Sequence, residues 1–289
     1  MISRTSFALL LALACPSIGL ADELEIDAAL GDLPVAYVDR PLNLPAKYIR
    51  LDGRMDAYRV LGQTHVDMNV GFALGLTSSI EFGVSSHRLG AIGDGIGNPG
   101  PVRFFGQGGA VPLSLRPGAD DPRFESVQLY GRIAAVQAAE FNLSIDVGAM
   151  IPTQSDLPWV MFVGVPIRAR LSERFSLDAA AEFSVAFFDD AMDGTDPYIS
   201  MHIPIAGVLN IVPQLYIAGR SGMYLPNMDF NEFTIPMTLE LGVTVAGERP
   251  WFDLVGSFGF PRLLVPGAED PVDANYWVAS FGINGFIGL

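Results

Sequence analysis

Apolar residues alternate with polar or small residues along most of this chain. In residues 65–76 every second position from Val66 onward is apolar, whereas the positions between them, such as Asp67, are polar or small. After Thr77-Ser78-Ser79 the same alternation resumes at residues 80–85. A period of two places one set of side chains on each face of a β-strand. We therefore predict two strands that are joined by a tight turn.

The alternation recurs down the sequence and predicts twelve strands in all. The predicted strands span residues 46–57, 65–76, 80–85, 126–136, 141–149, 159–171, 175–188, 198–207, 214–222, 233–245, 251–260 and 276–289. Short connections fall at 77–79, 137–140, 172–174, 210–214 and 246–250, and mostly longer ones fall at 89–123, 152–158, 189–197, 222–232 and 261–275. An even number of strands, with tight turns at one end and longer loops at the other, is typical of a bacterial outer-membrane barrel.

The apolar face of these strands must meet either lipid or a dry core. A soluble β-sandwich or a lipocalin-like barrel also alternates, but its polar face contacts water and is expected to be rich in Lys, Glu and Thr. Here that face is crowded with Gly, Ala and Ser, and Lys47 is the single lysine of the sequence. The chain is 17% charged and 50% hydrophobic, whereas about a quarter of an average soluble protein is charged. We therefore predict an all-β fold, a transmembrane antiparallel up-and-down β-barrel of about 12 strands with both termini in the periplasm.

The three tryptophans favour a membrane location. Trp159, Trp251 and Trp277 each open a predicted strand. Tryptophan is enriched at both membrane–water interfaces, and the ends of the strands of a membrane barrel lie there.

The first residues of the chain are typical of a secretory signal peptide. Arg4 precedes an apolar run, and small residues then lead to a predicted cleavage site after Ala21. A lipidation site at Cys15 would have Leu three residues before the cysteine, but Ala12 stands there. We assign residues 1–21 to the signal peptide, 22–45 to a periplasmic N-terminal lead and 46–289 to the barrel.

The charge of the chain argues against nucleic acid as a partner. The sequence contains 17 basic and 32 acidic residues, a net charge of −15, and cleavage of the signal with Arg4 makes it −16. No basic patch is available to neutralise phosphates. Cys15 is the single cysteine and belongs to the signal, so we expect no disulfide. The expected partners are outer-membrane lipid, the barrel assembly machinery and a small solute of unknown identity.

The parity of the strands places most of their charged residues on the inward face. These are six arginines and nine carboxylates, which give this face a net charge of −3. The predicted lumen-lining residues are Arg50, Asp52, Arg54, Asp56, Asp67, Glu81, Arg132, Asp146, Arg168, Arg170, Asp178, Glu182, Arg220, Glu240 and Asp253. Charges inside a barrel must be paired or hydrated. Two interpretations stay open: a salt-bridge network that stiffens a narrow barrel, and a charged constriction that filters small solutes with slight cation preference.

Some of these charges are expected to form pairs. The alternating charges of residues 50–56 form one side of an ionic ladder. Arg168 and Arg170 are expected to face Asp178 and Glu182 across a hairpin.

Two stretches of the sequence resemble a known group of proteins. RPLNLPAKYIRLDG at residues 40–53 leads into the first strand, and VGFALGLTSSIEFGV at residues 70–84 spans the first tight turn. Both look like uncharacterised outer-membrane β-barrels of Gram-negative bacteria, a porin-like family described as transporters. The resemblance implies the barrel architecture and an outer-membrane location. It implies neither a substrate nor a catalytic residue.

Two other activities fit the sequence poorly. An outer-membrane phospholipase needs a serine beside a histidine at the lipid boundary, but Ser86 and His87 point to opposite faces. Ser200 and His202 share a face, and parity makes it the lumen face. A Ca²⁺ site in the acidic loop 189–197 lacks the closing glutamate of an EF-hand, because Ser200 stands at the twelfth position. We expect no enzyme, no metal site and no cofactor.

The sequence thus predicts a passive or weakly selective channel for small solutes through a charge-lined lumen. The alternative is a plugged structural or surface-interaction barrel without transport. In that alternative the long loop at 89–123, which is rich in glycine, folds inward as a constriction.

Overall fold

The computed structural model describes most of the chain from Leu33 to the C-terminus. The described residues are 33–60, 63–87, 112–114, 123–124, 126–152, 159–187, 198–230, 233–245, 251–266, 271–272, 274–275 and 277–289. Pro34–Leu289 forms one compact unit. The predicted signal peptide, the acidic loop at 189–197 and most of the long loop at 89–123 lie outside the described residues.

Within these ranges, twelve long strands form the wall of a barrel. They are β1 (Tyr48–Val60), β2 (Gln63–Gly75), β3 (Ile80–His87), β6 (Ser126–Gln137), β7 (Phe141–Pro152), β8 (Trp159–Arg170), β9 (Phe175–Phe187), β10 (Tyr198–Val212), β11 (Leu215–Leu225), β12 (Ile235–Val245), β13 (Trp251–Leu264) and β14 (Trp277–Gly288). Two short strands, β4 (Pro112–Ser114) and β5 (Arg123–Phe124), and two 3-10 turns, η2 (Tyr37–Asp39) and η4 (Pro226–Met228), complete the described elements.

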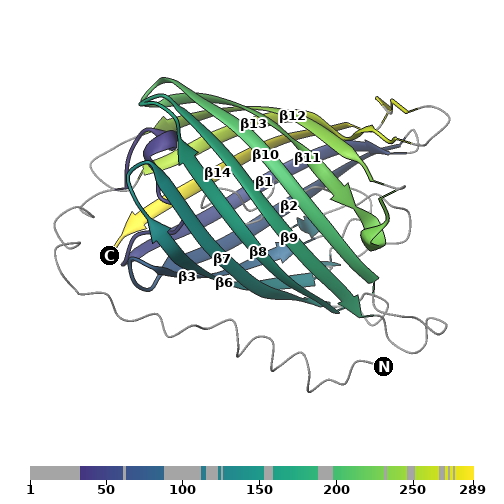
Figure 1. Cartoon of the computed structure of the whole chain (residues 1–289), viewed down its shortest axis with the longest axis horizontal. Coiled ribbons are helices and arrows are strands. Elements are labelled where there is room, and N and C mark those ends of the chain that lie inside the picture. Colours follow the sequence, from purple (N-terminus) through teal and green to yellow (C-terminus); the bar gives the residue numbers. More distant parts are fainter. Residues whose placement is uncertain are drawn as a thin grey trace. The chain divides into compact units, whose positions relative to one another are not determined.

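The wall closes because β1 pairs with β2 on one side and with β14 on the other (Figure 1). All of these pairings are antiparallel, and each wall strand pairs with the next one along the chain. At the closing seam Tyr48 lies opposite Gly288 and Arg59 lies opposite Trp277. A closed barrel leaves no free edge, so its backbone donors and acceptors are paired within the wall. The structure confirms the predicted fold, an antiparallel up-and-down barrel of twelve wall strands.

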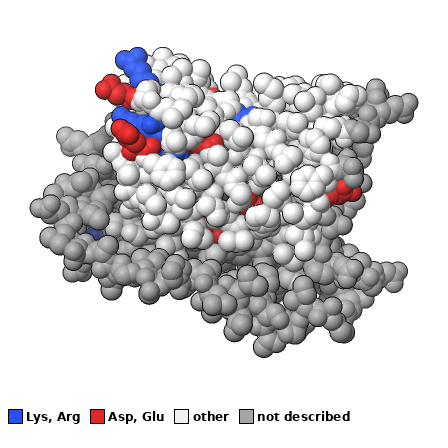
Figure 2. All heavy atoms as spheres, viewed as in Figure 1, with Lys and Arg blue, Asp and Glu red and all other residues white. Residues whose placement is uncertain are grey.

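The two faces of the wall differ as the alternation predicts. Outward positions expose large apolar side chains, for example Leu51 at 48%, Met161 at 50% and Leu239 at 66%. The next residue along the strand is usually buried, and Arg50 has no exposed surface. Figure 2 shows one face of the outer wall, and the described surface there is almost free of charged groups, with most of the visible charges gathered toward one end. Such a surface is unfavourable in water and favourable in lipid.

Four tight turns lie at one end of the barrel, which we call the short-turn end. They comprise residues 76–79, 138–140, 171–174 and 213–214. The start of β1 also lies there, because the amide of Lys47 donates to the carbonyl of Gly75, next to the turn at 76–79. The end of β14 lies beside it, and the amide of Leu289 donates to the carbonyl of Lys47 at 2.8 Å. We call the opposite end, where the longer connections lie, the long-loop end.

Several strands extend further toward the long-loop end than the sequence predicts, among them β11 and β13. β11 continues to Leu225 and β13 continues to Leu264. Gly222 and Pro261 interrupt the alternation, since both residues weaken a strand pattern. Gly222 has φ +152°, and a Cβ there would stand 2.5 Å from the carbonyl oxygen of Ile203.

Part of the predicted long loop at 89–123 belongs to the sheet. β4 pairs with β2 at Met68 and Asn69, beyond the point where β2 pairs with β3, and β5 pairs with β4. The rest of this loop lies outside the described residues, so its predicted inward fold stays a prediction.

The tryptophans begin strands as predicted. Trp159 and Trp277 open β8 and β14 at the long-loop end, and Trp251 opens β13 at the short-turn end. Among the described residues, no helix is long and apolar enough to cross a membrane.

Candidate functional site

Residues 34–45, which we call the inner segment, lie against the inward side chains of the wall near the short-turn end. The sequence assigns these residues to a lead that precedes the barrel. Tyr37, Leu42, Asn43 and Leu44 each expose 2% of their surface or less. Figure 1 shows the η2 turn of this segment within the ring of strand ends.

An apolar cluster packs one side of the inner segment onto β10 and β11. Tyr37, Val38 and Leu42 share this cluster with small wall residues such as Ala206 and Ala218. The rings of Tyr37 and Tyr216 are stacked, with centroids 4.3 Å apart. Burial raises the pKa of the Tyr37 phenol above its usual value, so this side chain stays neutral at physiological pH.

Buried arginines of the wall pair with carboxylates on neighbouring strands. Arg132 and Asp146 are opposite one another on β6 and β7 and form two hydrogen bonds of 2.7 Å. Arg168 and Asp178 are opposite on β8 and β9, with hydrogen bonds of 2.9 and 3.1 Å. Two-point pairing of this kind is the strongest geometry for an arginine–carboxylate contact.

The remaining donors of these arginines bind the backbone of the inner segment. Arg132 Nη1 donates to the carbonyl of Leu42 at 2.7 Å. Arg168 Nη1 donates to the carbonyls of Tyr37 and Arg40, at 3.1 and 2.6 Å. Each guanidinium therefore joins the wall and the inner segment, and its charge is balanced by the wall carboxylate.

Glu81 on β3 fixes the end of the inner segment that leads into β1. It accepts hydrogen bonds from the Leu44 amide at 2.7 Å and from the Tyr130 hydroxyl at 2.8 Å. Arg50 donates to the same hydroxyl at 3.1 Å and to Asp52 at 2.9 Å. Glu81 and Arg50 are fully buried, so each of their contacts replaces a lost contact with water.

Asn43 links the inner segment to two wall strands and to a tight turn. Its side-chain oxygen accepts a hydrogen bond from Ser144 at 2.6 Å, and its amide donates to the carbonyls of Ser79 and Arg132. On the other side, the Val38 amide donates to Asn210 at 3.0 Å. The contacts of the inner segment thus reach strands around most of the barrel.

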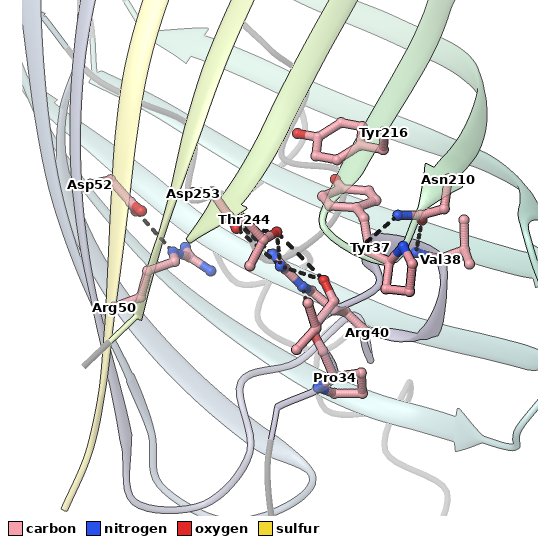
Figure 3. A network of polar contacts seen from close by, with 12 residues as sticks. Pro34, Tyr37, Val38, Arg40, Arg50, Asp52, Asn210, Tyr216, Thr244 and Asp253 are labelled. Atoms are coloured by element: carbon pink, nitrogen blue, oxygen red, sulfur yellow. Dashed lines mark hydrogen bonds and ion pairs between the residues drawn. The ribbon is translucent and has the colours of Figure 1, made fainter. Parts of the chain in front are cut away.

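Arg40 is the basic side chain of the inner segment, and it enters a buried site on β12 and β13 (Figure 3). Its two terminal nitrogens lie 2.5 and 3.0 Å from the Asp253 carboxylate. It also donates to the Thr244 hydroxyl at 2.8 Å, and its guanidinium lies 5.5 Å from the centre of the Phe286 ring. The carbonyls of Pro34 and Val35 accept its other hydrogen bonds.

A second tyrosine–glutamate–arginine group repeats the arrangement at Glu81. On β11 and β12, the Tyr216 hydroxyl donates to Glu240 at 3.1 Å, and Arg220 binds the same carboxylate at 2.6 and 3.0 Å. The two glutamates lie in similar sequences, IEFGV at residues 80–84 and LELGV at residues 239–243.

Other polar side chains of the inward face contact one another across the wall. Arg54 pairs with Asp56 at 2.5 Å and also donates to Ser280. Further round the wall, the hydroxyls of Ser184 and Ser200 are 2.6 Å apart.

The predicted lumen residues differ in the partners that the structure gives them. Those with described ion pairs in the wall are Arg50, Asp52, Glu81, Arg54, Asp56, Arg132, Asp146, Arg168, Asp178, Arg220 and Glu240. Arg170 and Asp253 instead pair with Asp39 and Arg40 of the inner segment. Glu182 is partly buried opposite Gly164 and His202, away from Arg170. The side chain of Asp67 lies outside the described residues.

Sequence reasoning missed the inner segment and the two buried tyrosines. The repeated glutamate–glycine stretch, together with QLY at 128–130 and at 214–216, was the available signal for Tyr130 and Tyr216. The apolar residues Tyr37, Val38 and Leu42, which are out of place in a hydrated lead, were the signal for burial.

The site contains no described arrangement typical of hydrolysis or metal binding. Ser200 contacts another serine, and the side chains of Ser86 and His87 lie outside the described residues. No group of three His, Cys, Asp or Glu in the described ranges is placed to hold a metal ion.

Comparison with known proteins gives a match at the level of the fold. No protein-family model matches the sequence, and no curated protein matches it. Among solved structures, the chain is similar to the NanC porin, with a TM-score of 0.53 at 8% identity over 83% of this chain and 100% of that one. It is also similar to the KdgM porin, with a TM-score of 0.51 at 5% identity over 81% and 97%. The fold is therefore that of outer-membrane porins.

Proposed function

We propose that the protein is an outer-membrane channel for small solutes, that its barrel interior is the pore, and that it has no enzymatic activity. In this proposal the short-turn end faces the periplasm, as tight turns do in bacterial barrels. Solutes pass between the long-loop end and the short-turn end along the polar inward face of the wall. The excess of carboxylates over arginines on that face favours cations slightly.

The observation that carries the proposal is the contrast between the two faces of one closed wall. The outward face is apolar, as lipid requires, whereas the inward face carries ion pairs and hydrogen-bonded polar groups on nearly every strand. A barrel built only to span the membrane could fill its interior with apolar side chains. The porin fold of the similar structures supports the same assignment.

The inner segment must be included in any account of transport. Arg132 and Arg168 expose 1% of their surface, and the segment covers them at the short-turn end. We therefore expect the pore to be closed while the segment is seated and to conduct when it moves. The same observation favours a second candidate function, a permanently plugged structural barrel.

Conductance in planar lipid bilayers separates these candidates. We expect the full chain to give rare, brief openings, and a variant lacking residues 34–45 to give frequent ones. Both proteins should first show the change in gel migration on boiling that marks a folded barrel. If neither folded protein conducts at any voltage, the channel proposal is wrong and the structural barrel is favoured.

A further inference from the structure

The site that holds Arg40 is built by the wall and occupied by a different part of the chain. Asp253 and Thr244 expose 1% and 3% of their surface, and Phe286 exposes 5%. They come from β13, β12 and β14, which are neighbours in the barrel. Figure 3 shows the guanidinium of Arg40 directed at Asp253 and Thr244 from the side of the inner segment.

The three wall residues match the chemistry of a guanidinium group. A planar guanidinium presents parallel N–H donors that fit the two oxygens of a carboxylate, and Asp253 accepts from two nitrogens in this way. The Thr244 oxygen accepts from one of them. The Phe286 ring, 5.5 Å away, supplies a π-face that attracts a weakly hydrated cation.

Asp253 differs from the other buried carboxylates of the wall in the source of its cation. The wall pairs Asp52 with Arg50, Asp146 with Arg132, Asp178 with Arg168 and Glu240 with Arg220. The ion pair that the described residues give to Asp253 comes from Arg40. If the inner segment left, the other carboxylates would keep their arginines and Asp253 would be a buried anion in need of a cation.

One hydrogen bond orients the site from within the wall itself. The Thr244 hydroxyl donates to Asp253 at 2.8 Å, which orients the carboxylate independently of the inner segment. Thr244 and Asp253 are directly opposite one another on β12 and β13. A site that is already oriented binds a new cation with less loss of conformational freedom.

We propose that Asp253, Thr244 and Phe286 form a binding site for the guanidinium group of a solute, and that Arg40 is a tethered occupant that such a solute displaces. This inference rests on the proposed function in one respect, that the barrel interior is accessible to solutes. The expected solutes are cations that carry a planar guanidinium group. A simple ammonium ion has the charge without the paired donors, so it should bind more weakly.

Removing the tethered occupant tests the site directly. In Arg40→Ala the site is vacant, and we expect methylguanidinium at millimolar concentration to raise the unfolding temperature of the folded barrel by about 2–4 °C. Methylammonium should give a much smaller rise. In the double variant R40A/D253N neither cation should have a specific effect, and this variant also reports any general effect of the ions on stability.

A second measurement applies if Arg40→Ala does not fold in detergent alone. We then expect methylguanidinium to increase the fraction of R40A that refolds to the barrel, which is recognised by its change in gel migration on boiling. The refolded fraction of R40A/D253N should not increase in the same way. Equal responses of the two variants, or equal effects of the two cations, would overturn the guanidinium site. If the cation-specific response is present but no variant conducts in bilayers, the binding site stands and the channel proposal fails.

Discussion

The ring of Tyr216 lies across Gly242 on the neighbouring strand, in the space that a side chain at that position would occupy. A Cβ on Gly242 would stand 2.1 Å from the ring of Tyr216. The same relationship holds between Tyr130 and Gly83, also at 2.1 Å. Each tyrosine donates to a glutamate two residues before the glycine it covers. The glycine therefore fixes the ring, and the ring fixes the buried glutamate.

The first prediction is that Gly242→Ala destabilises the barrel by about 1–3 kcal/mol, because the added methyl group must displace the Tyr216 ring. The displaced ring would also lose its contacts with Glu240 and Tyr37. Unfolding midpoints in detergent, followed by gel migration, measure the change. Gly219→Ala is the matched control, since a Cβ there meets nothing within 4 Å. Equal midpoints for the two variants would contradict the prediction.

The second prediction contrasts a buried and a partly exposed arginine of one strand. Arg168→Met should cost about 3–5 kcal/mol, because Asp178 is left as a buried charge without its partner. It also removes the donor to two carbonyls of the inner segment. Arg170→Ala should cost about 0–1 kcal/mol, since the Arg170–Asp39 pair is nearly one-third exposed. Unfolding of both variants under the same conditions tests the contrast, and a similar cost for both would refute it.

These two arginines also show how far the sequence could predict the interior. The short turn at 171–174 fixes the register of the hairpin, so Arg168 must stand opposite Asp178, as predicted. The same register places Arg170 opposite Ser176 and Glu182 opposite Gly164. The expected partnership of Arg170 with Glu182 was wrong, because the strands are antiparallel and the step from Arg168 to Arg170 leads from Asp178 to Ser176, away from Glu182.

The inner segment could not be predicted from alternation. Its contacts with Glu81, Arg132, Arg168 and Asp253 come from strands far apart in sequence, which meet only when the barrel closes. Local patterns predict strands and their faces because lipid imposes one rule on every strand. No comparable rule selects which residues before the first strand fill the interior.

The third prediction is that fixing the inner segment to the wall keeps the pore closed. The side chains of Asn43 and Ser144 are in contact, with oxygens 2.6 Å apart. The double variant Asn43→Cys/Ser144→Cys allows a disulfide there, and the mature chain is predicted to carry no other cysteine. We expect the oxidised protein to give no openings in bilayers and a reducing agent to restore them.

Each single cysteine variant serves as a control and should not respond to the reducing agent. If the oxidised double variant conducts as often as the reduced one, the inner segment does not have to move for conduction.

The fourth prediction concerns ion selectivity after the inner segment is removed. In a variant that lacks residues 34–45, Asp253 loses Arg40 and becomes an unbalanced negative charge on the wall. Asp253→Asn in that variant should lower the ratio of potassium to chloride permeability by about two- to four-fold at 0.1 M salt, because one charge acts within a Debye length of the pore. The effect should shrink at 1 M salt, where screening is stronger. Reversal potentials in a salt gradient measure the ratio.

Glu140→Gln, at an exposed position in a short turn, is the control for loss of one negative charge outside the wall. An equal change for Glu140→Gln and Asp253→Asn would show that Asp253 does not face the path of the ions.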